Sequence, residues 1–435
     1  MNPREFVRRR KQLMSMIGRG GIAIVPAAPE KVRNRDVHYP YRQDSDFYYL
    51  TGFAEPEAVA VLAPGRKSAE YILFCRDRDP ERETWDGRRA GQEGAVADYG
   101  ADDAFPIGDI DDILPGLLEP CERVYYTMGI HSDFDQRVIG WVNSLRTGGQ
   151  SGWHGPQEFV VLDHMLHDMR LYKSRSEVAA MRRAAKIAAT AHRRAMQRCR
   201  PGMKEYELEA EFLHEFRRHG ARPSYNPIVG GGENACVLHY VENNDELASG
   251  DLVLIDAGCE YDYYASDITR TFPVNGEFSE CQRIIYDIVL QANRDAIERV
   301  RAGHHWNEPH EAAVQSITKG LVKIGLLRGK VPSLIKSGAY KRYFMHRTGH
   351  WLGMDVHDVG DYKVGDQWRV LEPGMVMTVE PGIYIPPGTT GVAKKWWGIG
   401  VRIEDDVLVT RGDPEVLTKA LPTSADEIEA LMRAA

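Results

Sequence analysis

Four short apolar segments in the second half of the chain each carry a carboxylate, and this pattern restricts how the chain can fold. Asp256 ends "VLID", Asp267 precedes "ITRTF", Glu380 follows "VMTV" and Glu404 follows "VRI". The apolar runs are typical of buried strands, and a carboxylate buried beside them is costly unless it is paired or binds a metal ion. We therefore expect a fold that brings cations to these four side chains.

The cations could be protein side chains or metal ions. Arg270 and Arg402 lie in the same segments and are candidate ion-pair partners. Alternatively, the four carboxylates and His350 form an oxygen-rich ligand set without thiolates, which suits Mn²⁺, Co²⁺ or Mg²⁺ better than a structural zinc ion. Four negative charges nearly balance two divalent ions, and a two-metal site that holds a bridging hydroxide carries out hydrolysis.

Histidines cluster in "HRTGHWLGMDVHD", residues 346–358, which contains His346, His350 and His357. Together with His239 in "ACVLHY", they could donate hydrogen bonds to a substrate carbonyl or to a tetrahedral oxyanion. Each could equally be a core histidine whose hydrogen bonds are satisfied. The close spacing of the three favours a functional site.

Other motifs do not point to a different chemistry. The histidines of "HEFRRH", residues 214–219, are five positions apart, which places them about 140° apart around a helix rather than on the single face that a zinc-protease helix needs. "VGGGEN", residues 229–234, lacks the Lys-Ser/Thr pair of a phosphate loop. No G-x-S-x-G motif occurs in the sequence.

The sequence pattern indicates two domains. Up to about residue 170, strand-like runs such as "GIAIVP", "EAVAVLAP" and "EYILFC" alternate with Pro and Gly, which predicts an α/β domain. The stretch 144–157 is rich in glycine and predicts a loop. A capping box of Ser174 and Glu177 then opens a long helix, so we place the boundary near residue 172. Helical patterns at 204–219, 279–301 and 308–325 alternate with strand-like segments, which indicates α+β structure.

The composition excludes some classes of function. A net charge of -8 argues against a general nucleic-acid binder, and no apolar run approaches the roughly 18 residues that a membrane helix needs. The six cysteines are scattered without a CxxC pair, so reduced thiols are expected. We expect a soluble, cytoplasmic protein.

The second half of the chain resembles the pita-bread metallopeptidases, and within them the aminopeptidase P type. The resemblance runs through "LIDAG", "SDITRTFPVNG", "GHWLGMDVHDVG", "TVEPGIYI" and "GVRIEDDVLVT". "YPYRQDSDFYYLTGF" and "DRDPERETWDGRRAG" resemble the N-terminal domain of the same enzymes. The implied fold class is α+β: an N-terminal α/β domain, residues 1–172, for oligomerisation and substrate restriction, followed by a pita-bread catalytic domain, residues 173–435.

The resemblance implies a role for each residue of the metal set. Asp256 would bind one metal ion, Asp267 and Glu404 would bridge both, and His350 and Glu380 would complete the other. Glu380 would also take the proton of the attacking hydroxide. The implied cofactors are two divalent ions, Mn²⁺ in the first place, with Co²⁺ or Zn²⁺ as alternatives.

The remaining site residues are also carried over from the resemblance. His239 and His357 would steady the substrate carbonyl and the tetrahedral intermediate. The substrate pocket and the surroundings of the metals would be formed by His346, Tyr225, Tyr384 and Arg402. One departure is visible at Arg347, where relatives often carry Gly. If that position needs a positive φ, Arg347 is strained; otherwise its side chain can reach the substrate.

The expected activity is release of the N-terminal residue from peptides with proline in the second position. The first alternative is a prolidase, which cleaves only Xaa-Pro dipeptides on the same fold, and the second is a non-catalytic peptide-binding protein. The expected partners are peptides with an N-terminal Xaa-Pro and further copies of the chain, as a homodimer or homotetramer, with no nucleic acid and no membrane.

Overall fold

The computed structural model describes residues 1–147 and 155–434. The chain divides into two compact units, unit 1 (Met1–Met169) and unit 2 (Arg170–Ala435). The glycine-rich stretch 144–157, predicted as a loop, contains residues 148–154, which lie outside the described residues.

Unit 1 is built on a six-stranded sheet with the order β6-β5-β4-β1-β7-β8. The three runs predicted as strands form β1, β4 and β5, which pair antiparallel, while the other three strands join in parallel. The bounds are β1 (Gly21–Pro26), β4 (Val59–Leu62), β5 (Tyr71–Cys75), β6 (Asp103–Pro106), β7 (Arg123–Tyr125) and β8 (Glu158–Val160), with a separate hairpin of β2 (Val32–Asn34) and β3 (Val37–His38).

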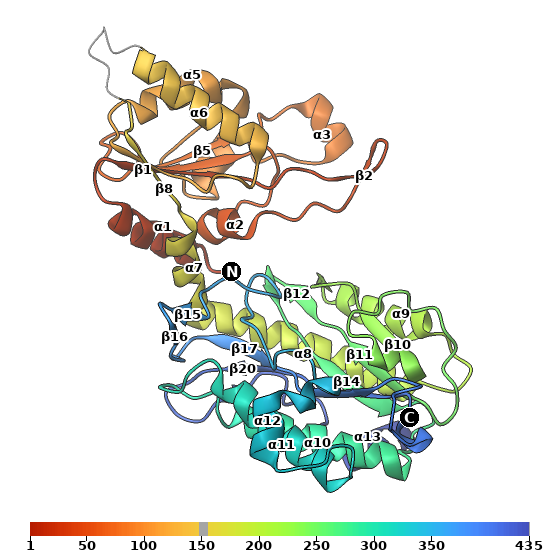
Figure 1. The fold of residues 1–435 in the computed structure, drawn as a ribbon. Helices are drawn as coiled ribbons and strands as arrows, with labels where there is room; N and C mark the ends of the chain where they lie inside the picture. The colour runs from red at the N-terminus through yellow and green to blue at the C-terminus, as the bar shows by residue number, and fades with distance from the viewer. Residues whose placement is uncertain (148–154, 435) are drawn as a thin grey trace. The chain divides into compact units, whose positions relative to one another are not determined.

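Helices cover both faces of this sheet (Figure 1). On one face, α5 and α6 bury apolar side chains such as Leu114 and Trp141 against Ile24 and Phe74 of the strands, and α1 and α2 lie on the other face. The helices are α1 (Pro3–Ile17), α2 (Ser45–Thr51), α3 (Pro80–Asp86), α4 (Gly91–Ala97), α5 (Ile110–Leu118), α6 (Ser132–Thr147) and α7 (Asp163–Leu171). This architecture confirms the expected α/β class of the N-terminal part.

Unit 2 contains several small antiparallel sheets. Two of them have the orders β10-β11-β14 and β17-β20-β21, and β18 pairs with β19. Asp256 ends β11, and Tyr384 and Arg402 lie in β18 and β19. The bounds are β10 (Ile228–Gly231), β11 (Leu252–Asp256), β14 (Thr269–Pro273), β17 (Val376–Val379), β18 (Gly382–Ile385), β19 (Ile399–Arg402), β20 (Asp405–Leu408) and β21 (Glu415–Val416), with β9 (Arg222–Pro223), β12 (Cys259–Tyr261), β13 (Tyr264–Ala265), β15 (Lys363–Val364) and β16 (Gln367–Trp368) outside them.

These sheets lie between two groups of helices, with α8 and α9 on one side and α10, α11 and α12 on the other (Figure 1). The predicted capping box at Ser174 and Glu177 is present at the start of α8. The helices are α8 (Arg175–Arg198), α9 (Glu205–Arg218), α10 (Glu280–Ile297), α11 (Glu308–Lys323), α12 (Val331–Ser337) and α13 (Ala425–Arg433). None of the helices within the described residues combines the length and the apolarity that crossing a bilayer requires.

The segment "GVRIEDDVLVT" differs from the single strand that its pattern suggests. It forms two strands, β19 and β20, which pair with different partners, β18 and β17. Glu404 stands at the change of partner, where its backbone N–H donates to Thr269 O at 3.1 Å. The division into two strands is determined by pairing with distant segments, which the local apolar pattern does not predict.

Candidate active site

Two neighbouring strands bring the first pair of predicted ligands together. Asp256 is the last residue of β11 and pairs in register with Thr269 of β14, and Asp267 lies two residues before Thr269. Glu404 is held beside them because its side chain accepts a hydrogen bond from the Thr269 hydroxyl at 2.7 Å. Three carboxylates from three segments therefore meet at one end of the β11–β14 ladder.

The other two predicted ligands reach the same place from the segment around β17. The backbone N–H of Thr378 in that strand donates to His350 O at 3.0 Å, and the His350 N–H donates to the Thr378 hydroxyl at 3.1 Å. The N–H of Glu380 donates to Thr348 O at 2.8 Å. Gly349 permits this close pairing, because a Cβ there would stand 2.0 Å from Thr378 O. The glycine in the histidine-rich segment is therefore a steric requirement for placing His350.

The donor atoms of the five predicted ligands converge. One ligand atom from each of Asp267, His350 and Glu404 lies within 4.8 Å of the others. His350 Nε2 is 3.3 Å from Asp267 Oδ2 and 3.9 Å from Glu380 Oε1. Asp256 joins the group through the Tyr225 hydroxyl, which lies 2.5 Å from one oxygen of Asp256 and 2.5 Å from one oxygen of Asp267.

Arg402 is the guanidinium that faces this cluster. Its Nη2 lies 2.6 Å from Asp256 Oδ2, its Nη1 donates to the Tyr384 hydroxyl at 3.0 Å, and its Nε donates to the Thr269 hydroxyl at 3.1 Å. Arg270, the other arginine considered as a partner, is instead paired with Asp405 at 2.7 Å. The protein thus supplies one of the two expected arginine cations.

The remaining charge makes this a fitting site for divalent cations. Four carboxylates face one guanidinium and the imidazole of His350 within a nearly buried cluster. Burial, followed by the charges of Asp267 and Glu380, raises the pKa of Glu404 well above its usual value, and burial raises the pKa of Glu380 to about 7. These shifts express negative charge that the protein alone does not neutralise. Carboxylate oxygens with one imidazole are the donors that Mn²⁺ and similar ions prefer.

The predicted substrate-side residues surround the same cluster. His346 Nε2 lies 2.9 Å from the Tyr384 hydroxyl and its Nδ1 lies 3.8 Å from Glu380 Oε2, and burial lowers the pKa of His346 to about 3. The rings of His357 and His350 meet edge to face with centroids 4.3 Å apart. Burial also lowers the pKa of His357, so burial favours the neutral imidazole at both His346 and His357.

A cavity of about 260 Å³ opens over the ligands. It is lined by all five predicted ligands, by His239, His346, His357 and Arg402, and by Leu238, Arg347 and Gly349. The cavity is smaller than the roughly 300–1,000 Å³ of typical small-molecule sites. It therefore suits a narrow segment such as the first residues of a peptide. Every residue predicted for the site lines this cavity or, in the case of Tyr225 and Tyr384, contacts a residue that does.

Supporting residues in this region were not identified from the sequence. The carboxylate of Asp406 accepts the backbone N–H of Asp267 at 3.2 Å. Asp358, next to His357, is paired with Lys173 at 3.0 Å and with Arg170 at 2.6 Å. In the sequence, the only indications of these residues are the second aspartate of "IEDD" and the aspartate of the "HD" pair. Neither motif indicates which residue the aspartate contacts.

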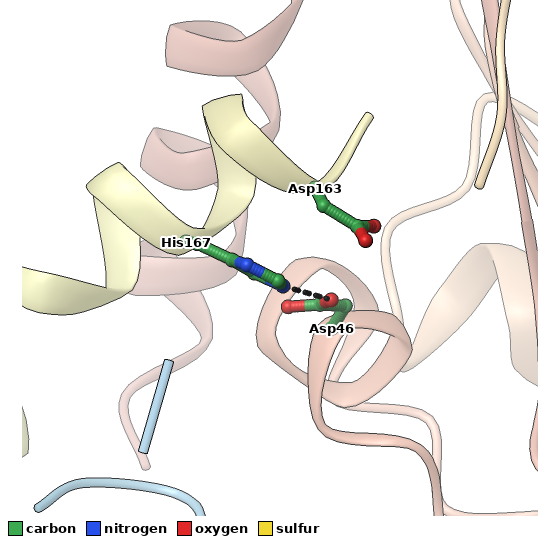
Figure 2. Close-up of side chains that lie close together, drawn as sticks. All are labelled: Asp46, Asp163 and His167. Atoms are coloured by element: carbon green, nitrogen blue, oxygen red, sulfur yellow. Dashed lines mark ion pairs between the residues drawn. The ribbon is translucent and has the colours of Figure 1, made fainter. Parts of the chain in front are cut away.

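Unit 1 contains a second group of metal-ligand side chain types, Asp46, Asp163 and His167 (Figure 2). His167 Nε2 lies 3.6 Å from Asp46 Oδ2, and Asp163 is hydrogen-bonded to the Thr127 hydroxyl. The three side chains are only partly buried. An ion pair and a hydrogen bond account for this group without a metal ion, in contrast to the crowded carboxylates of unit 2.

Comparison with known proteins covers both units. Residues 179–411 match metallopeptidase family M24, and residues 6–125 match the aminopeptidase P N-terminal domain. The Xaa-Pro aminopeptidase of Escherichia coli (strain K12) is 49% identical over 433 residues, which are 99% of this chain and 98% of that protein.

Solved structures agree with these sequence matches. Pseudomonas aeruginosa aminopeptidase PepP superimposes with a TM-score of 0.99 at 63% identity, over 100% of this chain and 98% of that one. Two structures of E. coli aminopeptidase P, a variant in complex with substrate and the Zn-substituted enzyme in complex with product, each give a TM-score of 0.97 at 49% identity, over 100% of this chain and 99% of theirs.

Proposed function

The chain belongs to metallopeptidase family M24 and acts as a Xaa-Pro aminopeptidase, and we propose that it does so through the carboxylate and histidine cluster of unit 2. It releases the N-terminal residue from peptides whose second residue is proline. The observation that carries this proposal is the convergence of the five donor side chains in one narrow cavity of a chain that matches such an enzyme over nearly its entire length.

The metal ligands are assigned as follows. Asp256 would bind one metal ion, Asp267 and Glu404 would be shared by both ions, and His350 and Glu380 would complete the second. The assignment is supported by the donor atoms of Asp267, His350 and Glu404, which lie within 4.8 Å of one another, and by the Tyr225 hydroxyl, which contacts both Asp256 and Asp267. When bound, two divalent ions polarise a carbonyl oxygen and lower the pKa of water.

Glu380 is the residue that accepts and passes on a proton. In the metal-free cluster burial raises the pKa of Glu380 to about 7, so its carboxylate holds a proton more readily than an exposed glutamate does. It also borders the cavity between His350 and His346, where an attacking water and the substrate carbonyl would meet.

The histidines on the other walls of the cavity hold the substrate. His239 and His357 donate hydrogen bonds to the carbonyl oxygen and to the tetrahedral intermediate, where preorganised donors are most effective. His346, Tyr384 and Arg402 form one hydrogen-bonded row that shapes the pocket for the proline ring, and Tyr225 fixes the two aspartates.

The metal in this proposal is Mn²⁺, with Co²⁺ or Zn²⁺ as alternatives. The donor set contains four carboxylates, one imidazole and no thiolate, which favours the harder ions. The Zn-substituted relative in complex with product indicates that the family accommodates zinc as well.

The compartment and the assembly are part of the same proposal. We place the protein in the cytoplasm, because its six cysteines are free thiols, as reducing compartments keep them. Residues 173–435 form the catalytic domain and contain the site. Residues 1–172 serve in oligomerisation, to a homodimer or homotetramer, and restrict access to that site. Exposed apolar side chains of unit 1, including Tyr39 and Trp85, support an association role.

The proposal is tested by mass spectrometry of peptides incubated with Mn²⁺-loaded protein. The substrates are an Xaa-Pro-Yaa tripeptide, a pentapeptide with the same start and an Xaa-Pro dipeptide, and the variants are Glu380→Ala and, as an exposed control, Glu277→Ala. We expect loss of one residue from the longer peptides, abolished only in Glu380→Ala. Cleavage of the dipeptide alone would make the protein a prolidase, and inactivity on all three would favour a binding role.

A further inference from the structure

Arg347 stands in the active-site cavity without backbone strain. It lines the cavity next to His346, and it is not among the non-glycine residues of positive φ, which are Arg35, Glu57, Asn243, Asp262 and Tyr263. Of the two readings that the sequence left open, strain is therefore excluded. The arginine adds a cation to the cavity wall at no conformational cost to the main chain.

The Arg347 guanidinium is held over an aromatic ring. Its central carbon is 5.1 Å from the centroid of the Trp368 ring, and Lys363 Nζ is 4.6 Å from the same centroid, both within the roughly 6 Å range of cation–π contacts. Lys363 and Trp368 are paired residues of the β15–β16 hairpin. Two cationic side chains therefore contact the same indole ring. Their mutual repulsion is unfavourable unless an anion or solvent lies next to them.

The cavity offers Arg347 no acidic partner of its own. Among the described residues, none forms an ion pair or a side-chain hydrogen bond with Arg347 or Lys363. The other arginine of the cavity, Arg402, is fully engaged by Asp256, Tyr384 and Thr269. A planar guanidinium with five unused donors matches a carboxylate in a two-point contact.

We propose that Arg347, supported by Trp368 and Lys363, is a specificity-determining residue that binds a carboxylate of the substrate beyond the proline. This inference rests on the proposed function. In the proposed function the N-terminal residue of the peptide lies at the proposed metal ligands, so the C-terminal part of a short peptide points away from them. Arg347 is the cation of the cavity wall that those ligands do not engage. The carboxylate can be the C-terminus of a tripeptide or an acidic side chain at the third position.

The test compares matched peptides on the Mn²⁺-loaded enzyme. The substrates are Ala-Pro-Ala as the free acid, Ala-Pro-Ala amide and Ala-Pro-Glu amide, and kcat and KM are measured for the wild type, Arg347→Ala and Arg347→Lys. The wild type should favour the free acid over the neutral amide by about 3- to 10-fold in kcat/KM, the range expected of a partly exposed charge-assisted contact. The preference should lie in KM and should shrink as salt is raised.

The two Arg347 variants distinguish the effect of the positive charge from that of the planar guanidinium. In Arg347→Ala the ratio of free acid to amide should fall to about 1, and Arg347→Lys should retain part of it. Arg328→Ala removes an exposed arginine that does not line the cavity and should keep the wild-type ratio. A preference for Ala-Pro-Glu amide but not for the free acid would assign the contact to an acidic side chain. If neither the free acid nor Ala-Pro-Glu amide is preferred over Ala-Pro-Ala amide more strongly by the wild type than by Arg347→Ala, the inference alone is overturned. If the wild type cleaves none of the peptides, the proposed function falls and this inference with it.

Discussion

The guanidinium of Arg402 lies 2.6 Å from the carboxylate of Asp256, and both groups are nearly buried. Arg402 therefore balances one of the four carboxylates before any metal ion binds. It also donates to the Tyr384 and Thr269 hydroxyls, so the proposed ligand Asp256 is oriented by a residue that is itself held by two further hydrogen bonds. Arg402 neutralises part of the negative charge of the four carboxylates, and the metal ions would neutralise the rest.

Removing this arginine should destabilise the metal-free protein more than the metal-loaded one. Arg402→Ala leaves Asp256 as a buried charge without its cation, which costs about 3–5 kcal/mol, whereas a bound metal ion takes over that compensation. We expect denaturant unfolding to show the larger loss in chelator and a smaller loss in Mn²⁺. Arg402→Lys, which keeps the charge but not the planar fork, is the control. An equal loss in both conditions would show that Arg402 acts only as a structural residue.

Glu404 should be needed for full metal occupancy. Its side chain is held by Thr269 and faces Asp267 and His350, so Glu404→Gln removes a shared negative ligand while keeping its shape. Elemental analysis after dialysis against trace Mn²⁺ should find two ions per chain in the wild type and fewer in the variant. Asp413→Asn, an exposed aspartate, should behave as the wild type. Two ions bound to Glu404→Gln would refute the shared-ligand assignment.

The carboxylates of the proposed metal site could be singled out in the sequence because each stands beside an apolar strand. Asp256 and Glu380 follow runs of buried residues, and a carboxylate in such a place needs a cation wherever the strands end up. The helices could be predicted equally well from the sequence. The ranges predicted for α9, α10 and α11 match the observed helices, with ends that differ by a few residues.

The partners of these residues could not be predicted, because they depend on contacts between distant segments. Lys173 and Asp358 are separated by 185 positions, and nothing local marks them as a pair. The same holds for the division of "GVRIEDDVLVT" into β19 and β20, which follows from pairing with β18 and β17. Local pattern specifies which residues are buried, whereas tertiary pairing specifies what they meet.

Asp358 should be the anchor of the segment that carries His357. Burial alone would raise the pKa of Asp358, but Lys173 and Arg170 hold it below its usual value. Asp358→Asn leaves Lys173 without its buried counter-charge and Arg170 with the more exposed Asp355 as an ion-pair partner. We expect a loss of about 3–5 kcal/mol in unfolding free energy together with a lower kcat. Asp366→Asn changes an exposed aspartate nearby and should alter neither quantity. If the stability falls but kcat does not, Asp358 does not position His357.

The pH dependence of stability should contain a contribution from His192, a fully buried histidine of α8. Its Nε2 lies 3.0 Å from the backbone oxygen of Ala257, the residue after the proposed ligand Asp256, and its ring meets that of Phe212 edge to face with centroids 4.7 Å apart. Burial lowers the pKa of His192 to about 3, so the folded chain keeps this imidazole neutral and uses it as a hydrogen-bond donor.

The sign of the effect follows from the two states. In the unfolded chain the imidazole titrates near pH 6.5, so between about pH 6.5 and pH 3 the unfolded state binds a proton that the folded state does not. Acidification through this window therefore favours unfolding, by up to about 1.4 kcal/mol per pH unit from this one group. Measured by urea unfolding of metal-free protein from pH 7 to pH 4.5, His192→Gln should show a shallower slope than the wild type. His214→Gln, an exposed histidine of the neighbouring helix α9, should keep the wild-type slope, and a wild-type slope in His192→Gln would mean that His192 is charged in the folded protein.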